Sequence, residues 1–371
     1  MDSPLARAES SSQFPRRLQL GAALSLSGRY AFLGGLAAAG LRAVVREVRS
    51  RGGVRTTEGR LLPQLGLVDD GGTREGVRRG LDALVEADLL IGPYGSDLVG
   101  EAARWAAEQG QVLWNHGGSA DRVQRLPGVV SAPSPASRYF APVLEALADP
   151  LPGARILLGV GGGPFGGGIA EGVREAAGRV GMEIVGTVAP AEAADSSGAD
   201  VLLLAGTFAE DVECLRRLRP RPRAVAAVAA AMDIFRPALG PEADGVLGPS
   251  QWEEGVRHPI DVGPRQGDAV RGLRAEAVPQ LQPGPGHVDY PAAQAYAAGL
   301  IAMRCVEEVG SLEERALLEA ARRLRCTTFF GRFGLGEDGR QGDHDVLAVQ
   351  WQQGVKRVVW PPHLSEVPVA L

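Results

Sequence analysis

The sequence predicts an α/β protein made of two doubly wound, Rossmann-like lobes with mainly parallel sheets. Apolar runs of strand length alternate with amphipathic stretches of helical period, and this alternation starts afresh near residue 154. The length supports the same prediction, because 371 residues suit two domains of ordinary size.

The first series of elements covers residues 18–115. Its helix at 73–87 has the clearest helical period, since apolar residues recur there at i, i+4, i+7 and i+8. We expect strands at residues 18–26, 60–69, 89–92 and 111–115, and helices at residues 37–51, 73–87 and 97–109.

The second series of elements begins at residue 154 and, unlike the first, ends in two consecutive strands. Two strand-like runs, 346–351 and 355–360, are joined by a Gln-Gly turn, which predicts a β-hairpin rather than another βα unit. Before it we expect strands at 154–160, 183–188, 200–205 and 224–230, and helices at 166–180, 209–218, 290–309 and 312–324. Gly- and Pro-rich stretches at 131–135, 248–267 and 282–286 are predicted to lack regular structure.

Composition argues against several classes of protein. Hydrophobic residues make up 45% and charged residues 22% of the chain, and the formal net charge is −5. A disordered chain would be less apolar, and the sequence has no broad basic field to attract nucleic acid. Because a membrane-spanning helix needs roughly 18 consecutive apolar residues, which the sequence does not approach, we also expect no direct membrane insertion.

The cysteines and histidines do not follow the spacing of a metal site. Three cysteines lie far apart, and no two histidines among five stand at the i, i+4 spacing of a helical ligand pair. We therefore expect no metal and no cofactor.

Residues 1–17 are polar and contain no apolar core of a secretory signal, so we expect a disordered lead-in. As it stands, this sequence indicates a cytoplasmic location. A translation start farther upstream that added a signal segment would instead indicate a periplasmic or extracytoplasmic one.

Segment 21–53 opens with GAALSLSG and closes with VREVRSRGG, and it resembles the opening of the leucine/isoleucine/valine-binding protein family, which has the type I periplasmic-binding fold. Later segments resemble motifs of that family in the family's order. They are Asp69-Asp70, IGPYGS at 91–96, the helix at 165–181, DVLLLAG at 200–206, the Ala-rich helix at 290–310 and the closing segment at 328–353.

The resemblance implies two lobes joined by three crossovers, with a ligand held between them by closure of the lobes. It further implies a solute-binding protein of an ABC importer, whose partners are a small-molecule ligand and an ABC permease. The crossovers would fall near residues 132–137, 248–252 and 332–339, where Gly and Pro suit a hinge. The implied lobes are residues 18–134 plus 253–332 and residues 135–252 plus 333–371.

Loops that follow the expected strands carry the candidate ligand-binding residues, because ligands of open α/β sheets bind beyond the carboxyl ends of the strands. Ser96 opens a helix, so its hydroxyl either meets a ligand oxygen or only caps that helix. The family uses this Ser for a ligand carboxylate, and amide-binding relatives also place a Tyr two residues before it, as Tyr94 is here.

The next loop offers Gly117, Gly118 and Ser119, where relatives hold the ligand through backbone and hydroxyl groups; the alternative is a plain turn. Asn115 and His116 either contact the ligand or bridge loops. In the second lobe the resemblance points to Phe165, in place of the family's usual Tyr, and to Thr207.

The run at 225–231 is apolar, although amino-acid binders of the family carry there a Glu that holds the ligand's ammonium group. Burying an ammonium without a counter-charge costs several kcal/mol. Asp233 could serve only if it reaches inward, and it equally fits the start of a helix. We therefore expect a neutral, amide-like or anionic ligand.

Enzymatic alternatives find little support. The glycine-rich stretch at 159–168 lacks the G-x-G-x-x-G pattern with its distal acidic residue, and the chain has no P-loop and no G-x-S-x-G motif. We expect no enzymatic activity, with a two-domain glycosyltransferase as the distant alternative. A cytoplasmic amide-type sensor of the same fold is the closer one.

Overall fold

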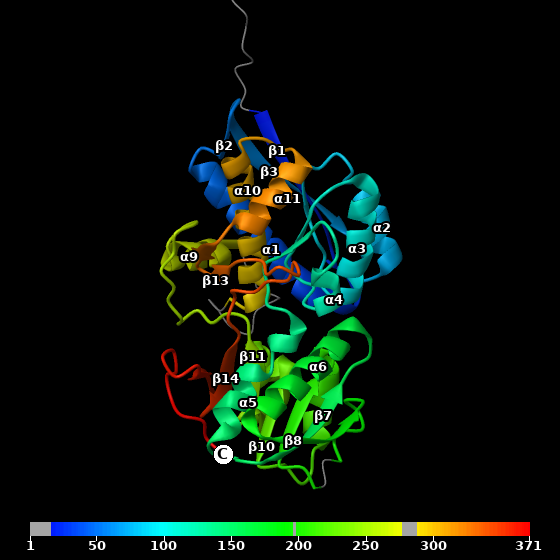
Figure 1. The fold of residues 1–371 in the computed structure, drawn as a ribbon, viewed down its shortest axis with the longest axis vertical. Coiled ribbons are helices and arrows are strands. Elements are labelled where there is room, and N and C mark those ends of the chain that lie inside the picture. Colours follow the sequence, from blue (N-terminus) through cyan, green and yellow to red (C-terminus); the bar gives the residue numbers. More distant parts are fainter. Residues whose placement is uncertain (1–15, 196–197, 277–287) are drawn as a thin grey trace, which may run out of the picture.

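The computed structural model describes residues 16–195, 198–276 and 288–371. These residues form two lobes that follow one another along the long axis of the molecule, each built on its own mixed but mostly parallel sheet (Figure 1). The predicted α/β class with two Rossmann-like lobes is confirmed.

The sheet of the first lobe has the strand order β2-β3-β1-β4-β5-β6, and only the β2–β3 pair is antiparallel. Side chains alternate between its faces, so that Leu20 and Ala22 of β1 join one core and Ala23 joins the other. The strands are β1 (Arg16–Leu24), β2 (Val54–Thr56), β3 (Gly59–Asp69), β4 (Leu89–Ile91), β5 (Leu113–Asn115) and β6 (Val129–Ser131).

Helices cover both faces of this sheet. One face packs against α1, α9, α10 and α11, and the other packs against α2 and α3. The chain thus returns to the first sheet late in the sequence, as the orange helices of Figure 1 show. The helices are α1 (Ala31–Ser50), α2 (Arg74–Asp82), α3 (Ser96–Gln109), α4 (Asp121–Gln124), α9 (Gln266–Glu276), α10 (Tyr290–Val309) and α11 (Glu314–Arg323).

The sheet of the second lobe has the order β15-β14-β11-β10-β9-β7-β8, with antiparallel pairs at the β15-β14-β11 edge. Helices α5 and α6 cover one face, and α7 and α8 the other. The elements are α5 (Ala141–Ala148), β7 (Arg155–Val160), α6 (Gly163–Val180), β8 (Glu183–Val188), β9 (Val201–Ala205), α7 (Phe208–Arg217), β10 (Ala224–Ala227), α8 (Phe235–Leu239), β11 (Leu247–Ser250), β14 (Leu347–Gln352) and β15 (Val355–Trp360). A separate small hairpin is formed by β12 (Cys326–Thr328) and β13 (Gly331–Phe333).

Several boundaries differ from the expected ones. Helix α2 ends at Asp82 rather than residue 87, because Leu84 and Ala87 turn inward and pack over Gly21 of β1. The expected strand at 224–230 ends at Ala227 and continues as a 3-10 turn, where Asp211 accepts the N–H of Ala229 at 3.2 Å.

Two stretches expected to lack structure behave differently. The stretch 248–267 contains part of β11, which pairs with β10 and β14, and the first two residues of α9. The expected lead-in 1–17 overlaps β1, which starts at Arg16; its other residues lie outside the described ranges. The stretch 282–286 also lies outside them.

Within the described ranges, no helix combines the length and apolar character needed to cross a membrane.

Candidate functional site

The two candidate loops of the first lobe lie side by side at the carboxyl ends of β4 and β5. Tyr94 and Gly117 form an isolated parallel bridge, and Gly95 N–H donates to the carbonyl of Gly117 at 3.0 Å. Parallel neighbouring strands end at the same sheet edge, so their loops meet there. Tyr94, Ser96 and residues 117–119 therefore form one surface.

Tyr94 is half-buried and faces the start of α10. Its hydroxyl lies 3.4 Å from that of Tyr290, and its ring lies 6.3 Å from the ring of Tyr30. Burial raises the pKa of both Tyr94 and Tyr290 well above the ordinary phenol value. Both hydroxyls thus stay protonated at neutral pH and can donate as well as accept hydrogen bonds.

Ser96 is the first residue of α3 and is only 8% exposed. The residue that caps the helix is Gly95, with φ near 102°, and the Ser96 hydroxyl instead accepts the backbone N–H of Ala120 at 3.0 Å. The interpretation of Ser96 as a helix cap is therefore wrong. Its hydroxyl ties the two candidate loops together.

Two features explain why residues 117 and 118 are glycines: the close packing around them and the buried side-chain amide of Asn115. A Cβ on Gly117 would lie 2.6 Å from the carbonyl oxygen of Pro93, and one on Gly118 would lie 2.7 Å from Cβ of Val99. Asn115 Oδ1 accepts the N–H groups of both glycines, at 3.1 and 2.7 Å. Asn115 thus holds the loop in shape, and its amide also donates to Ser131 Oγ of β6 at 2.8 Å.

Ser119 and Phe165 come together through a residue that sequence reasoning missed. The hydroxyl of Ser119 lies 2.8 Å from that of Tyr139, and the ring of Tyr139 meets Phe165 edge-on at 5.4 Å between centroids. Tyr139 lies between β6 of the first lobe and α5 of the second, and Phe165 lies in the first turn of α6. Tyr139 therefore connects the first-lobe loops to the second lobe.

Thr207 has a different setting. It is exposed and caps α7: its hydroxyl accepts the N–H of Glu210 at 3.3 Å, and Glu210 Oε2 accepts the N–H of Thr207 at 2.7 Å. This capping box occupies the Thr207 hydroxyl. The adjacent Phe208 is the residue that packs against apolar clusters of both lobes.

His116 is fully buried next to this surface. Its ring lies 6.3 Å from the ring of Tyr94, and burial lowers its pKa to about 4. The imidazole is therefore neutral at physiological pH, and in this structure it lies inside the first lobe.

A charged group lies at the same interface; we call Lys356, Asp233, Glu253 and Asp289 the lysine cluster. Of these residues, sequence reasoning weighed only Asp233, whose side chain does reach inward, to Lys356. Lys356 Nζ lies 2.8 Å from Asp233 Oδ1 and 3.1 Å from Glu253 Oε1. Asp289 immediately precedes α10 of the first lobe without a side-chain capping bond to it, and its Oδ1 instead accepts the N–H of Asp233 of the second lobe at 2.9 Å. Lys356 is the only lysine of the chain, which was the one sequence signal available.

Burial and mutual charge shift the titration of these groups. Burial raises the pKa of Asp289 to about 7, partly offset by Lys356, and burial also raises the pKa of Glu253. Burial alone would lower the pKa of Lys356, but the surrounding carboxylates outweigh it and raise that pKa. Lys356 therefore remains charged and offsets part of the negative charge of its neighbours.

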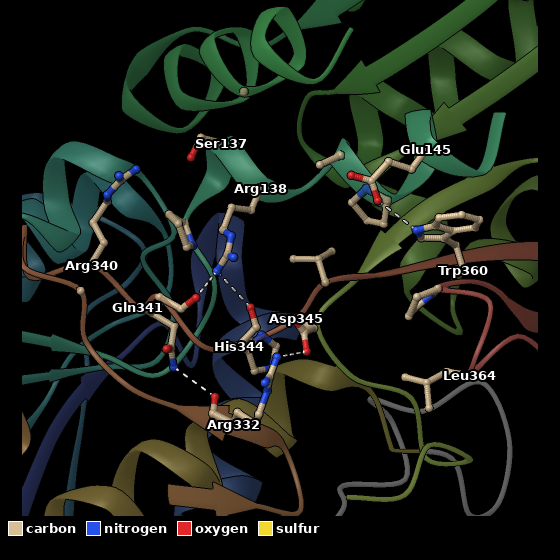
Figure 2. A pocket seen from close by; sticks show the side chains of 18 of the residues that line it. Ser137, Arg138, Glu145, Arg332, Arg340, Gln341, His344, Asp345, Trp360 and Leu364 are labelled. Atoms are coloured by element: carbon tan, nitrogen blue, oxygen red, sulfur yellow. Dashed lines mark hydrogen bonds and ion pairs between the residues drawn. The ribbon is translucent and has the colours of Figure 1, made fainter. Parts of the chain in front are cut away.

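A cavity of about 1320 Å³ lies on the crossover side of the interface (Figure 2). Arg138 donates there to the carbonyls of Gly342 and His344 at 2.5 and 3.4 Å, and Trp360 Nε1 donates to Glu145 at 3.0 Å. Its walls carry charges of both signs and come from described residues other than the seven predicted ones. Among the described residues, no group of three or more His, Cys, Asp or Glu is arranged to hold a metal.

Solved structures of similar fold cover nearly the whole chain. A solute-binding protein of an ABC transporter from R. palustris, in complex with benzoate, shares 19% identity over 92% of this chain and 95% of its own, with a TM-score of 0.74. The leucine-binding protein LivK of Thermotoga maritima shares 14% over 92% and 97%, with a TM-score of 0.76. LivJ of Streptococcus pneumoniae, in complex with isoleucine, shares 15% over 93% and 100%, with a TM-score of 0.74.

No curated protein matches the sequence significantly. The family model described as periplasmic binding protein, in contrast, matches residues 17–356, which is most of the chain. This match agrees with the two-lobed fold and with the family resemblance of the sequence motifs. The chain therefore belongs to the periplasmic binding protein family.

Proposed function

We propose that this protein is a solute-binding protein that captures a small polar ligand between its lobes for an ABC importer, without chemical turnover. The observation that carries the proposal is the convergence of the Tyr94–Ser96 loop, the 117–119 loop and Tyr139 with Phe165 at the interface between the lobes. The family match supports it.

The lobes would close on the ligand by rotation at the three crossovers. We place one lobe at residues 18–134 plus 253–332 and the other at residues 135–252 plus 333–371. A ligand that touches both lobes stabilises the closed population by its differential affinity for that state. Hydrogen bonds such as Ser119–Tyr139 would reopen and re-form around the ligand.

We propose a distinct role in ligand binding for each candidate residue. The hydroxyls of Ser96 and Ser119 would bind the oxygen-rich end of the ligand, with the backbone of Gly117 and Gly118 beside them. Tyr94 and Phe165 would cover its apolar part. Thr207 is the least suited of the predicted residues, because its hydroxyl is used in the capping box of α7.

Relatives of this fold are described in complex with benzoate, 4-hydroxybenzoate and isoleucine, so the ligand class is a small carboxylate, amide or amino-acid-like molecule. Isothermal titration calorimetry with benzoate, 4-hydroxybenzoate, acetamide, leucine and isoleucine tests the proposal. We expect one of these classes to bind with a stoichiometry of about one, as a single cleft requires.

Ser96→Ala and Ser119→Ala are expected to weaken that binding about ten-fold or more, because a hydrogen bond to a charged group contributes about 1.5–3 kcal/mol. Ser50→Ala is the matched control, since Ser50 ends α1 and bonds only the carbonyl of Glu47 among the described contacts. Turnover of a bound ligand, or unchanged affinity in both serine variants, would contradict the proposal.

A further inference from the structure

Lys356 has the surroundings of a bound ammonium ion. It extends from the edge strand β15, and its side chain is only 10% exposed. Its Nζ faces three acceptors: the carbonyl of Ala231 at 2.7 Å, Asp233 Oδ1 at 2.8 Å and Glu253 Oε1 at 3.1 Å. An ammonium group has three N–H donors. The carbonyl of Ala231 and the carboxylate of Asp233 accept from Nζ, and Glu253 Oε1 adds an ion pair.

The lysine cluster is continuous with the candidate ligand-binding surface. Asp233 donates its backbone N–H to Asp289 across the lobes, and the next residue, Tyr290, places its hydroxyl 3.4 Å from that of Tyr94. Asp233 of the cluster follows the carboxyl end of β10 and Glu253 follows that of β11, both on the second-lobe side of the interface. An ammonium group on a ligand that lay against Tyr94 would therefore find its nearest carboxylates here.

Asp233 and Glu253, the two carboxylates that contact Lys356, already have a cation. A ligand ammonium would have to displace a tethered ammonium whose effective concentration is in the millimolar range or higher. A displaced Lys356 would also be left buried at a cost of several kcal/mol, because it has only 10% of its side chain in solvent. Ligands without an amino group avoid both costs.

We propose that Lys356 determines the charge class of the ligand: it occupies the ammonium site of the interface and restricts the protein to small carboxylates or amides without an amino group. This proposal rests on the proposed function. It adds a specificity-determining residue that excludes one class of ligand by competition rather than by shape.

The test compares ligands that differ only in the amino group: 4-methylpentanoate with leucine, and 3-phenylpropanoate with phenylalanine. We expect the parent protein to bind the amino-free member of a pair at least ten-fold more tightly. Lys356→Met should shift this ratio at least ten-fold toward the amino acid. Arg357→Met is the matched control, because Arg357 is half exposed and pairs with Glu366 on the surface, and its ratio should equal the parent's.

A second measurement does not depend on a known solute. Lys356→Ala leaves the acceptors of the lysine cluster without their cation, so methylammonium chloride should raise its melting temperature above the value in sodium chloride of equal ionic strength. The parent and Arg357→Met should show no such difference. If Lys356→Ala does not fold, protection of Lys356 from an amine-acylating reagent in the parent, followed by peptide mass spectrometry, replaces this readout.

The outcomes separate the two proposals. Parent binding that favours leucine or phenylalanine, or an unchanged ratio in Lys356→Met, overturns the role of Lys356 while the solute-binding function stands. Absence of methylammonium rescue, or ready acylation of Lys356 where that readout is used, also overturns the ammonium-site assignment. If no ligand of any class binds the folded parent, the solute-binding function fails, and the specificity role of Lys356 fails with it.

Discussion

At the scale of single residues, Asn115 shows how one buried amide shapes the candidate surface. It is fully buried and makes four hydrogen bonds, to Gly117 N, to Gly118 N and O, and to Ser131 Oγ. Asn115→Ala leaves these groups unsatisfied in the interior. We expect a loss of about 2–4 kcal/mol in the free energy of unfolding, measured by urea denaturation.

Ser131→Ala is the matched control for this prediction, because the side chain is equally buried but shares only one of the four bonds. It should cost about 1 kcal/mol. Equal losses in the two variants would show that the loop does not depend on the amide of Asn115.

Steric fit at Gly118 gives a second prediction at the residue scale. A Cβ at this position would approach Cβ and both methyl groups of Val99 within 3.0 Å. Gly118→Ala should therefore cost about 1–3 kcal/mol of stability. Val99→Gly removes Cβ and both methyl groups, so the double variant should be more stable than the sum of the single changes predicts, as a double-mutant cycle would measure. Simple additivity would contradict this explanation of the glycine.

At the scale of elements, α6 combines glycines that the packing requires with glycines that it does not. A Cβ on Gly172 would lie 1.8 Å from the carbonyl oxygen of Ser137, so α6 can lie against the first crossover only without a side chain there. Gly178 of the same helix has open space around it. Gly172→Ala should lose more than about 2 kcal/mol, whereas Gly178→Ala should gain about 0.5–1 kcal/mol from its better helix propensity. Thermal melts of both variants that shift in the same direction would contradict this.

The elements also show what could be predicted from the sequence. Long periodic segments such as α10 were predicted residue for residue, and β8 and β15 were too, because apolar spacing is a local property. Strand β11 was missed because its Leu-Gly-Pro-Ser sequence is typical of a turn, and its strand geometry comes from pairing with β10 and β14. Such tertiary pairing leaves no local pattern.

At the scale of the whole molecule, the candidate surface could be predicted from the local sequence, whereas the lysine cluster, which depends on tertiary contacts, could not. Tyr94, Ser96 and the 117–119 loop directly follow strands, so chain order alone placed them together. Lys356 and its three carboxyl partners come from four distant segments, and only the folded chain brings them into contact. The apolar run at 225–231 pointed to a missing ligand carboxylate, but it could not indicate a lysine that the chain itself supplies.

Buried titratable groups make the stability of the whole molecule depend on pH in two opposing ways. Burial raises the pKa values of Asp211 and Asp289 to about 7, so each favours the folded state fully below the unfolded carboxyl value near 4 and loses that contribution as the pH rises to about 7. Burial lowers the pKa values of His116 and His344 to about 4, so their contribution is present above about 6.5 and is lost as the pH falls toward 4.

Asp289→Asn isolates the contribution of Asp289 to the pH dependence of stability from those of the other buried groups. The asparagine carbonyl can still accept the N–H of Asp233, which bonds Asp289 Oδ1 at 2.9 Å, but it carries no charge to bury next to Asp233, Glu253, Lys356 and Tyr290. The variant should gain stability relative to the parent as the pH rises from 5 to 8, by an amount on the order of 2 kcal/mol. Urea denaturation at several pH values measures this difference, with Asp149→Asn at an exposed site as control. A difference that stays constant across this range would mean that Asp289 is already ionised at pH 5, and that Lys356 compensates its charge more completely than burial opposes it.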